Sequence, residues 1–242
     1  MAYERETIQQ IRSEVDRYDR HQQLSEEATM DTPSRTVPRI ILCSEVRRSL
    51  TVSAYGSILS EDLGIKDFVT PLLNLLQGRI GSNPKFNKVG CCTSYHPILL
   101  TRQVKMYSSC RVSHLCQETG GLQREIFHVT PTWQNSGPRY DSVIIQGQQR
   151  SSLFFAEVRG LFSVCVNSTT FGVAVVKPFI RKPRNKITGY IELEVKEGEF
   201  EFCSVESIIR TVHILPPTPH NQRFVVQDLT DGDMYLRLVH FK

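Results

Sequence analysis

The residues of this chain best suited to chemistry of their own are five cations within ten positions: Lys177, Arg181, Lys182, Arg184 and Lys186. Pro178 and Pro183 lie among them and keep the stretch out of a helix, so we expect an extended basic loop. Such a loop could follow the phosphates of a nucleic acid or act as a nuclear-import signal. A solvated loop without a partner is the alternative. Phe179 and Tyr190 could stack on bases or pack within the protein.

A second group of residues could bind zinc. Cysteines and histidines gather between residues 91 and 116, and a tetrahedral site needs four such ligands. The candidates are Cys91, Cys92, His96, Cys110, His114 and Cys116. No Cys-x-x-Cys pair is present, and adjacent cysteines usually point in opposite directions. Buried thiols and a surface histidine are the alternative, and we expect no metal and no other cofactor.

Catalytic residues are harder to find. A two-metal nuclease needs carboxylates that hold two divalent ions about 4 Å apart. The available aspartates, which do not follow an alternating series of strands and helices, are Asp141, Asp228, Asp231 and Asp233. A Gly-x-Ser-x-Gly elbow, a phosphate-binding Gly-Lys-Ser/Thr loop and a Gly-x-Gly-x-x-Gly fingerprint are all missing, and nothing fixes a cysteine nucleophile near a histidine. We therefore expect no enzyme activity and no small-molecule substrate.

The single tryptophan, Trp133, lies among turn residues, after Thr130-Pro131 and shortly before Gly137-Pro138. An aromatic side chain on a loop offers a large contact area. Trp133, together with Tyr140, could therefore line an interaction groove. The alternative is a plug over the end of a barrel. His213 is expected at the edge of the core.

Composition and charge limit the class of protein. The 242 residues are 40% hydrophobic and 22% charged, as in an ordinary globular protein. Residues 1–27 hold four Arg and seven Asp or Glu, which leaves 25 basic and 18 acidic residues in the rest of the chain, so the body is basic. No apolar run approaches the roughly 20 residues of a spanning helix, and no signal-peptide pattern is present. We expect an intracellular protein with reduced cysteines and no membrane attachment.

Helical periodicity dominates the first third of the chain. Ile8, Ile11, Val15 and Tyr18 recur at steps of three and four residues, which predicts an amphipathic helix over residues 1–27 that lies on a partner or on its own domain. A linker over 28–38 follows. Apolar residues between 39 and 78 again recur at helical steps, so residues 39–90 are predicted to form a helical hairpin and a loop.

Beyond about residue 95 the apolar period becomes two. Seven short runs rich in β-branched and aromatic residues predict antiparallel strands: 98–107, 126–129, 141–146, 153–166, 171–176, 190–195 and 199–202. Residues 204–213 have a helix-like stripe, and 231–240 fit a short helix or a strand. The chain is thus expected to be α+β: N-terminal helices, then over residues 91–242 a small antiparallel barrel with a C-terminal helix, similar in architecture to bromo-adjacent homology (BAH) and SH3-like barrels.

A series of short motifs runs in order through the same region. They are Gly120-Gly121, Arg124-Glu125, Thr130-Pro131-Thr132-Trp133, Arg139-Tyr140-Asp141-Ser142-Val143, Ala156-Glu157-Val158, Gly172-Val173, Thr188-Gly189-Tyr190 and Ser207-Ile208-Ile209-Arg210 with His213 and Pro216. This series resembles the C-terminal region of fungal transposases of the Kyakuja-Dileera-Zisupton and Plavaka type. The resemblance covers residues 95–240 and, more faintly, 37–78.

The resemblance implies a tail without the catalytic portion of the transposase. Such a tail is a non-catalytic accessory module that contacts DNA, a chromatin protein or another transposase subunit, and that works in the nucleus. The family's loop before the Thr-Gly turn is acidic, whereas residues 177–186 are basic here. A metal-dependent nuclease or transposase fragment and a transposon relic without present function remain the alternatives.

Overall fold

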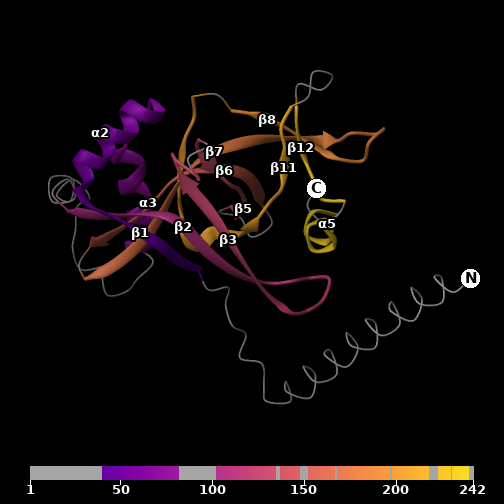
Figure 1. The fold of residues 1–242 in the computed structure, drawn as a ribbon, viewed down its shortest axis with the longest axis horizontal. Helices are drawn as coiled ribbons and strands as arrows, with labels where there is room; N and C mark the ends of the chain where they lie inside the picture. The colour runs from indigo at the N-terminus through magenta and orange to yellow at the C-terminus, as the bar shows by residue number, and fades with distance from the viewer. Residues whose placement is uncertain are drawn as a thin grey trace, which may run out of the picture. The chain divides into compact units, whose positions relative to one another are not determined.

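The computed structural model describes residues 40–81, 102–134, 137–147, 152–166, 168–196, 198–217, 223–229 and 231–239 (Figure 1). The chain divides into two units, residues 1–37 and 38–242, and every described residue belongs to the second. The predicted helix at 1–27, the linker at 28–38, the loop at 82–90 and the zinc candidates Cys91, Cys92 and His96 lie outside the described residues. No helix among the described residues is long and apolar enough to cross a membrane.

The first described element is a strand, β1 (Ile40–Thr51), so the helix predicted from residue 39 was wrong. β1 pairs antiparallel with β2 (Gln103–Leu115) along its whole length. The helix-like step from Val46 to Leu50 crosses a register shift in this pairing, where a bulge changes the alternation of a strand. Pairing with a strand distant in sequence therefore outweighed the local spacing.

The predicted helical hairpin is confirmed for the residues that follow. Helix α2 (Val52–Leu63) begins at Thr51, whose hydroxyl accepts a hydrogen bond from the Ala54 N–H, and ends at Gly64 with φ of 70°. Helix α3 (Val69–Gly81) carries Pro71 in its first turn, where a missing N–H costs little. The apolar side of this hairpin packs on the sheet, with Tyr55 5.1 Å from Phe162 between ring centres.

The rest of the unit is a curled, half-barrel sheet of antiparallel strands. All seven predicted runs overlap strands, so the α+β prediction is confirmed at this level. The sheet order is β11-β12-β8-β7-β6-β2-β3-β4, with β1 beside β2, β5 between β6 and β10, and β9 beside β7. The strands after β2 are β3 (Leu122–Thr130), β4 (Arg139–Tyr140), β5 (Ser142–Gln146), β6 (Leu153–Val166), β7 (Thr169–Arg184), β8 (Ile191–Val195), β9 (Glu201–Ser204), β10 (Ile208–Thr211), β11 (Ile214–Leu215) and β12 (Phe224–Val226).

The end of the chain differs from the predicted pattern. The helix expected over 204–213 was wrong, because Val205–Ser207 form one 3₁₀ turn and Ile208–Thr211 form β10. Pairing of Ile208 with Ile145 on β5 places this apolar stripe in the core. The segment that fitted either a helix or a strand is helix α5 (Gly232–Val239), whose Met234 and Leu238 are buried beneath the sheet.

Candidate nucleic-acid interface

The basic stretch 177–186 is the end of a paired strand. β7 continues through it to Arg184, β8 pairs antiparallel with β7, and β12 lies on the other side of β8. The register shifts between Arg181 and Arg184, where Pro183 has no N–H to donate to the sheet. The segment is extended, as predicted, but it is a strand and not a loop. We call residues 179–195 together with residues 223–228, which include β12, the basic arm; its turn extends beyond β12 at the right of Figure 1.

The turn at the end of the basic arm is held by its own hydrogen bonds. The Asn185 side-chain oxygen accepts from the N–H groups of Ile187 and Thr188 at 2.8 and 3.2 Å. The Gly189 N–H donates to the Asn185 carbonyl at 2.8 Å, and Arg184 donates to the Gly189 carbonyl, also at 2.8 Å. Gly189 has φ of 77°, a backbone conformation that favours glycine. The Ile187 side chain at the tip is 94% exposed.

Two acidic residues of β8 organise one group of cations. Lys182 Nζ lies 2.8 Å from Glu194 Oε2, and Arg223 Nη1 lies 2.6 Å from Glu192 Oε2. Asn185 donates to the other oxygen of Glu192 at 2.7 Å. Hydrogen bonds from Asn185 and Arg223 lower the pKa of Glu192, so this carboxylate keeps its charge and anchors both strand and turn.

A second group of cations gathers around Asp228, just after β12. Arg184 Nη2 lies 2.5 Å from Asp228 Oδ2. Arg181 is half-buried nearby, and burial together with the charge of Arg184 lowers its pKa, which Asp228 opposes. Asp228 thus pairs with Arg184 and also acts electrostatically on Arg181.

Two of the three carboxylates of the basic arm lie beneath cations, and the third, Glu194, is 38% exposed beside Lys182, which is 32% exposed. The Asp228 side chain is fully buried and that of Glu192 is 9% exposed, whereas those of Arg184 and Arg223 are 30% and 46% exposed. Lys186 in the turn is exposed and has no ion-pair partner among the described residues. The aromatic residues of the arm are less available: Phe179 is buried against Phe224, and Tyr190 is half-buried.

The predicted groove residues are Trp133 and Tyr140, and an arginine guanidinium lies over the ring of each. Arg139 lies 4.5 Å from the centre of the Trp133 ring, and Arg159 lies 4.5 Å from that of Tyr140. His128 also approaches Trp133, at 4.4 Å between ring centres. Cation–π contacts of this kind hold both aromatic side chains in place.

Tyr140 and Arg139 also line a pocket of about 270 Å³ between the β3–β4 corner and the segment after β10. Asp141 fixes its wall, since it accepts from Arg139 Nε at 3.0 Å and from the His128 N–H at 2.8 Å. The pocket therefore combines an ion pair with hydroxyl groups and short apolar patches. Its lining residues are Ile126, Arg139, Tyr140, Asp141, Ser142, Thr211, Val212, His213 and Ile214.

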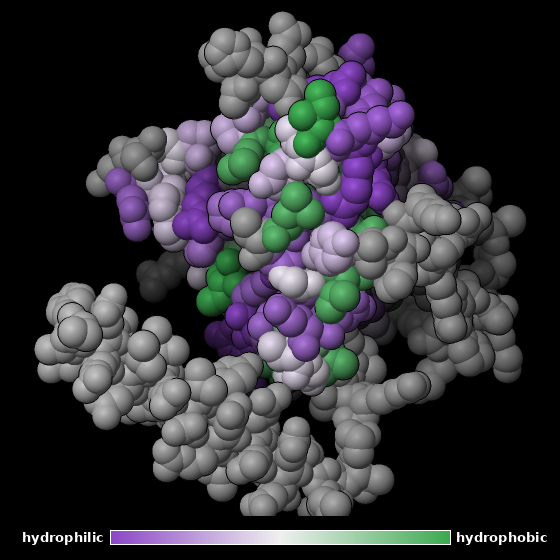
Figure 2. Space-filling view, turned by 90° about the vertical axis from the view of Figure 1, so that its right-hand side faces the viewer, coloured by the Kyte–Doolittle hydropathy of each residue, from purple (hydrophilic) through white to green (hydrophobic). Residues whose placement is uncertain are grey.

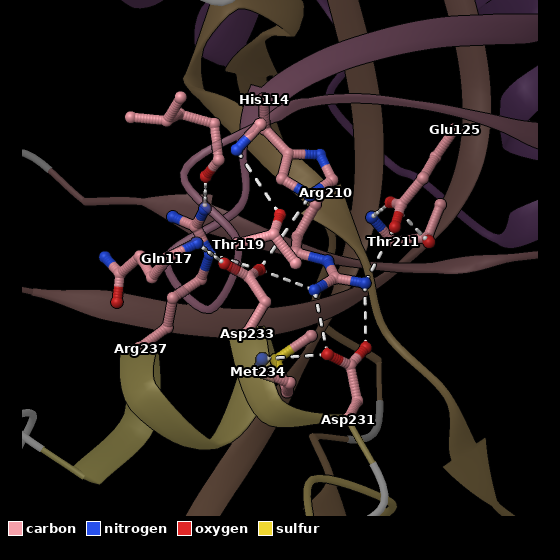
Figure 3. A network of polar contacts seen from close by, with 12 residues as sticks. His114, Gln117, Thr119, Glu125, Arg210, Thr211, Asp231, Asp233, Met234 and Arg237 are labelled. Atoms are coloured by element: carbon pink, nitrogen blue, oxygen red, sulfur yellow. Dashed lines mark hydrogen bonds and ion pairs between the residues drawn. The ribbon is translucent and has the colours of Figure 1, made fainter. Parts of the chain in front are cut away.

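Three carboxylates do converge in this fold, and they converge on Arg210 (Figure 3). Arg210 on β10 lies 2.7 Å from Glu125, 2.8 Å from Asp231 and 2.6 Å from Asp233. Glu125 also accepts from the N–H and hydroxyl of Thr211 at 2.8 and 2.7 Å. The expectation that the aspartates stay apart was thus wrong for Asp231 and Asp233, because helix α5 carries them back to β10. The group at their centre is a guanidinium.

This arginine network joins α5 to the β2–β3 hairpin. Asp233 accepts from the Gln117 N–H at 2.5 Å and from Arg237 Nε at 2.7 Å, and Arg237 donates to the Leu115 carbonyl. His114 is buried beside it, with Nε2 3.8 Å from Asp233 Oδ2 and neither ring nitrogen hydrogen-bonded within the described structure.

The charges of the network stabilise one another. Burial lowers the pKa of Arg210, but Glu125, Asp231 and Asp233 outweigh it and the net pKa is raised. Burial likewise raises the pKa of Asp233, and hydrogen bonds from Arg237, Gln117 and Arg210 bring it below its usual value. For His114 burial lowers the pKa and leaves the ring neutral. The network is an ionised anchor for α5.

The described zinc candidates are Cys110, His114 and Cys116, and all three are buried. Cys110 lies in the core with Phe127, and burial raises its pKa to about 12. No group of three or more His, Cys, Asp or Glu in the described ranges could hold a metal ion.

The sequence analysis gave no structural role to Glu125 or Arg210, although both lie in the motif series, and it did not single out Arg223 or Ile187. The first three acquire their roles from partners distant in the chain, which no local pattern reveals. Ile187 had a local signal: it is an apolar residue inside a turn, two positions before the Gly189 of the predicted Thr-Gly turn.

No protein-family model matches the chain, and neither a curated protein nor a solved structure is detectably similar to it.

Proposed function

We propose that this chain is a non-catalytic accessory module that binds duplex DNA through the basic arm. The observation that carries the proposal is the pairing of two partly exposed arginines, Arg184 and Arg223, with the buried carboxylates of Asp228 and Glu192, while Lys186 stays exposed in the turn. The order of motifs that resembles the tails of fungal transposases supports it, and a curled sheet is compatible with the BAH-like or SH3-like architecture that we propose. A nuclear location is part of the proposal.

The ion pairs of the arm prepare it for phosphate binding. Each paired cation is held in place before DNA arrives, so less side-chain entropy is lost on binding. A guanidinium has five N–H donors, and Arg184 uses two of its nitrogens on Asp228 and the Gly189 carbonyl. Donors therefore remain for phosphate oxygens while the internal ion pair persists.

The second candidate partner is a chromatin protein or a second transposase subunit. The pocket beside Tyr140 favours it, because the pocket offers an acceptor, a donor and hydroxyl groups in about 270 Å³. That volume suits one side chain of a partner. It is the second candidate, since a pocket of this size supplies little contact area on its own.

The test is the salt dependence of binding to a short duplex of random sequence, measured by fluorescence anisotropy. We expect the Lys182→Gln, Lys186→Gln and Arg223→Gln triple variant to bind more weakly and to lower the slope of log affinity against log salt by about three units, since each lost phosphate contact removes about 0.9.

The matched control changes the same number of charges elsewhere. Three exposed arginines have no ion-pair partner in the described part of the chain: Arg102 just before β2, Arg111 on β2 and Arg124 on β3. Their triple replacement by Gln should leave most of the slope intact. If both triple variants lose the same slope, binding follows net charge alone and the arm is not the interface.

A further inference from the structure

We infer that Ile187 is a wedge that enters the base stack of bound DNA and bends the duplex. The inference rests on the proposed function, because the arm must first be held on the phosphates. The inference gives Ile187, which carries no charge, a role separate from the phosphate contacts of the cations.

The first argument is the exposure of Ile187. It is 94% exposed, against 60% for Leu115 and 52% for Leu122, the next most exposed large hydrophobic residues in the described ranges. Figure 2 views the molecule from the side to which the arm points, and hydrophobic residues on that face stand apart among hydrophilic ones. An isolated aliphatic side chain at a tip is suited to insertion and not to covering a flat surface.

The second argument is the rigidity of the turn that carries it. The Ile187 N–H is bound to Asn185, and the hydrogen bonds of Gly189 close the turn behind it. Asn185 is itself tied to Glu192 on β8. These bonds fix the backbone of the turn and therefore keep Ile187 at the tip of the arm.

The third argument is the position of the cations. Lys186 precedes Ile187, and Arg184 lies at the base of the same turn. Proteins that kink DNA insert an apolar side chain between base steps while basic residues hold the phosphates, which offsets the cost of unstacking. A lipid surface or an apolar pocket of a partner protein would also accept an isoleucine. The two cations close to the tip, Lys186 and Arg184, favour the phosphates of DNA over an apolar pocket.

The experiment uses duplexes that carry 2-aminopurine, whose fluorescence rises when a base unstacks, and donor and acceptor dyes at the ends to report bending. The wild-type chain should unstack the probe and shorten the end-to-end distance. It should also bind a duplex with one mismatched step roughly tenfold more tightly than a matched one, because the mismatch is cheaper to open.

The Ile187→Ala variant should lose the fluorescence change, the bending and the preference for the mismatch, while it keeps the salt slope on matched DNA. Its unfolding temperature should not change, because the side chain makes almost no contacts. Ile187→Met should retain the wedge. The matched control is Leu122→Ala at the tip of another hairpin, which should behave as wild type.

Each outcome separates the two proposals. Salt-dependent binding without unstacking or bending in the wild type overturns the wedge and leaves the DNA-binding module intact. Failure of the wild type to bind duplex DNA overturns both. Binding to vesicles of phosphatidylserine and phosphatidylcholine that depends on Ile187, without bending of DNA, assigns the tip to a lipid surface and overturns the wedge.

Discussion

At the scale of single residues, the most consequential side chain for the fold is Arg210. Its side chain is 7% exposed and binds three carboxylates from β3 and from the region of α5. A buried ion pair is a weak source of net stability, but loss of one partner leaves charge without compensation. Arg210 therefore determines whether Glu125, Asp231 and Asp233 can stay ionised inside the protein.

We predict that Arg210→Met lowers the free energy of unfolding by about 3–5 kcal/mol, because it leaves buried carboxylates unpaired. Urea denaturation measures the change. The control is Lys105→Met, which breaks the exposed pair with Glu45 and should cost about 1 kcal/mol or less. Equal effects of the two variants would contradict the proposed role of Arg210.

A second prediction concerns pH and His114. Burial holds the pKa of His114 below its ordinary value of 6.5, so the unfolded chain binds the proton more readily than the folded one. The stabilisation of the folded state by the neutral His114 ring is therefore complete above pH 6.5 and is lost as the pH falls below that value. The charges of Glu125 and Asp233 partly oppose this shift, since they raise the pKa of His114. The charges of Arg210 and Arg237 lower it, as burial does.

We expect stability to fall between pH 6.5 and 5 in the wild type and to be flatter over this range in His114→Leu, measured by urea denaturation at each pH. The Asp233 contribution lies lower: its pKa is depressed below 3.8, so its stabilisation is present above that pH and is lost in stronger acid. An unchanged slope between pH 6.5 and 5 in the variant would show that His114 does not titrate with folding.

At the scale of elements, the turn of the basic arm depends on one side chain. Asn185 binds two N–H groups of the turn and the Glu192 carboxylate of β8. Local side-chain acceptors of this kind define turns. The shape of the tip thus depends on Asn185, and the charge of the arm depends on other residues.

Asn185→Ala should therefore weaken bending of DNA while the salt slope stays near that of the wild type. We also expect a loss of about 1–2 kcal/mol in the free energy of unfolding, from the hydrogen bonds that disappear. Bending by energy transfer and urea denaturation measure the two effects. Thr188→Val, which removes only a 3.4 Å contact to the Tyr190 N–H, is the control; equal loss of bending in both variants would argue against Asn185 as the determinant.

The elements differ in how far the sequence predicts them. Strand β8 follows from the alternation of its apolar residues with glutamates, and β6 follows from its β-branched and aromatic residues. β1 and β10 were missed, because their strand state comes from pairing with β2 and β5 and their apolar residues repeat at helical steps. The cluster of cations was visible in the composition, whereas the buried carboxylates beneath it and the exposure of Ile187 depend on how β7, β8 and β12 assemble.

At the scale of the whole molecule, the aspartates considered for catalysis are each paired with an arginine. Asp141, Asp228 and the Asp231–Asp233 pair each bind an arginine, so each has a structural partner. We predict that the purified chain does not cut supercoiled plasmid with Mg²⁺ or Mn²⁺, assayed on agarose gels. Metal-dependent cleavage that survives in the Lys182, Lys186 and Arg223 triple variant would favour the nuclease alternative.

The carboxylates of the basic arm also affect the rate at which the arm associates with DNA. The arm has five cations (Arg181, Lys182, Arg184, Lys186 and Arg223) and three anions (Glu192, Glu194 and Asp228). The net charge of the arm is therefore only +2, and salt largely screens it beyond the Debye length of about 10 Å at 0.1 M. Long-range steering is then weak, and the rate of association should resemble that of an uncharged surface. Differences in affinity between DNA sites should appear mainly in how long each complex lasts.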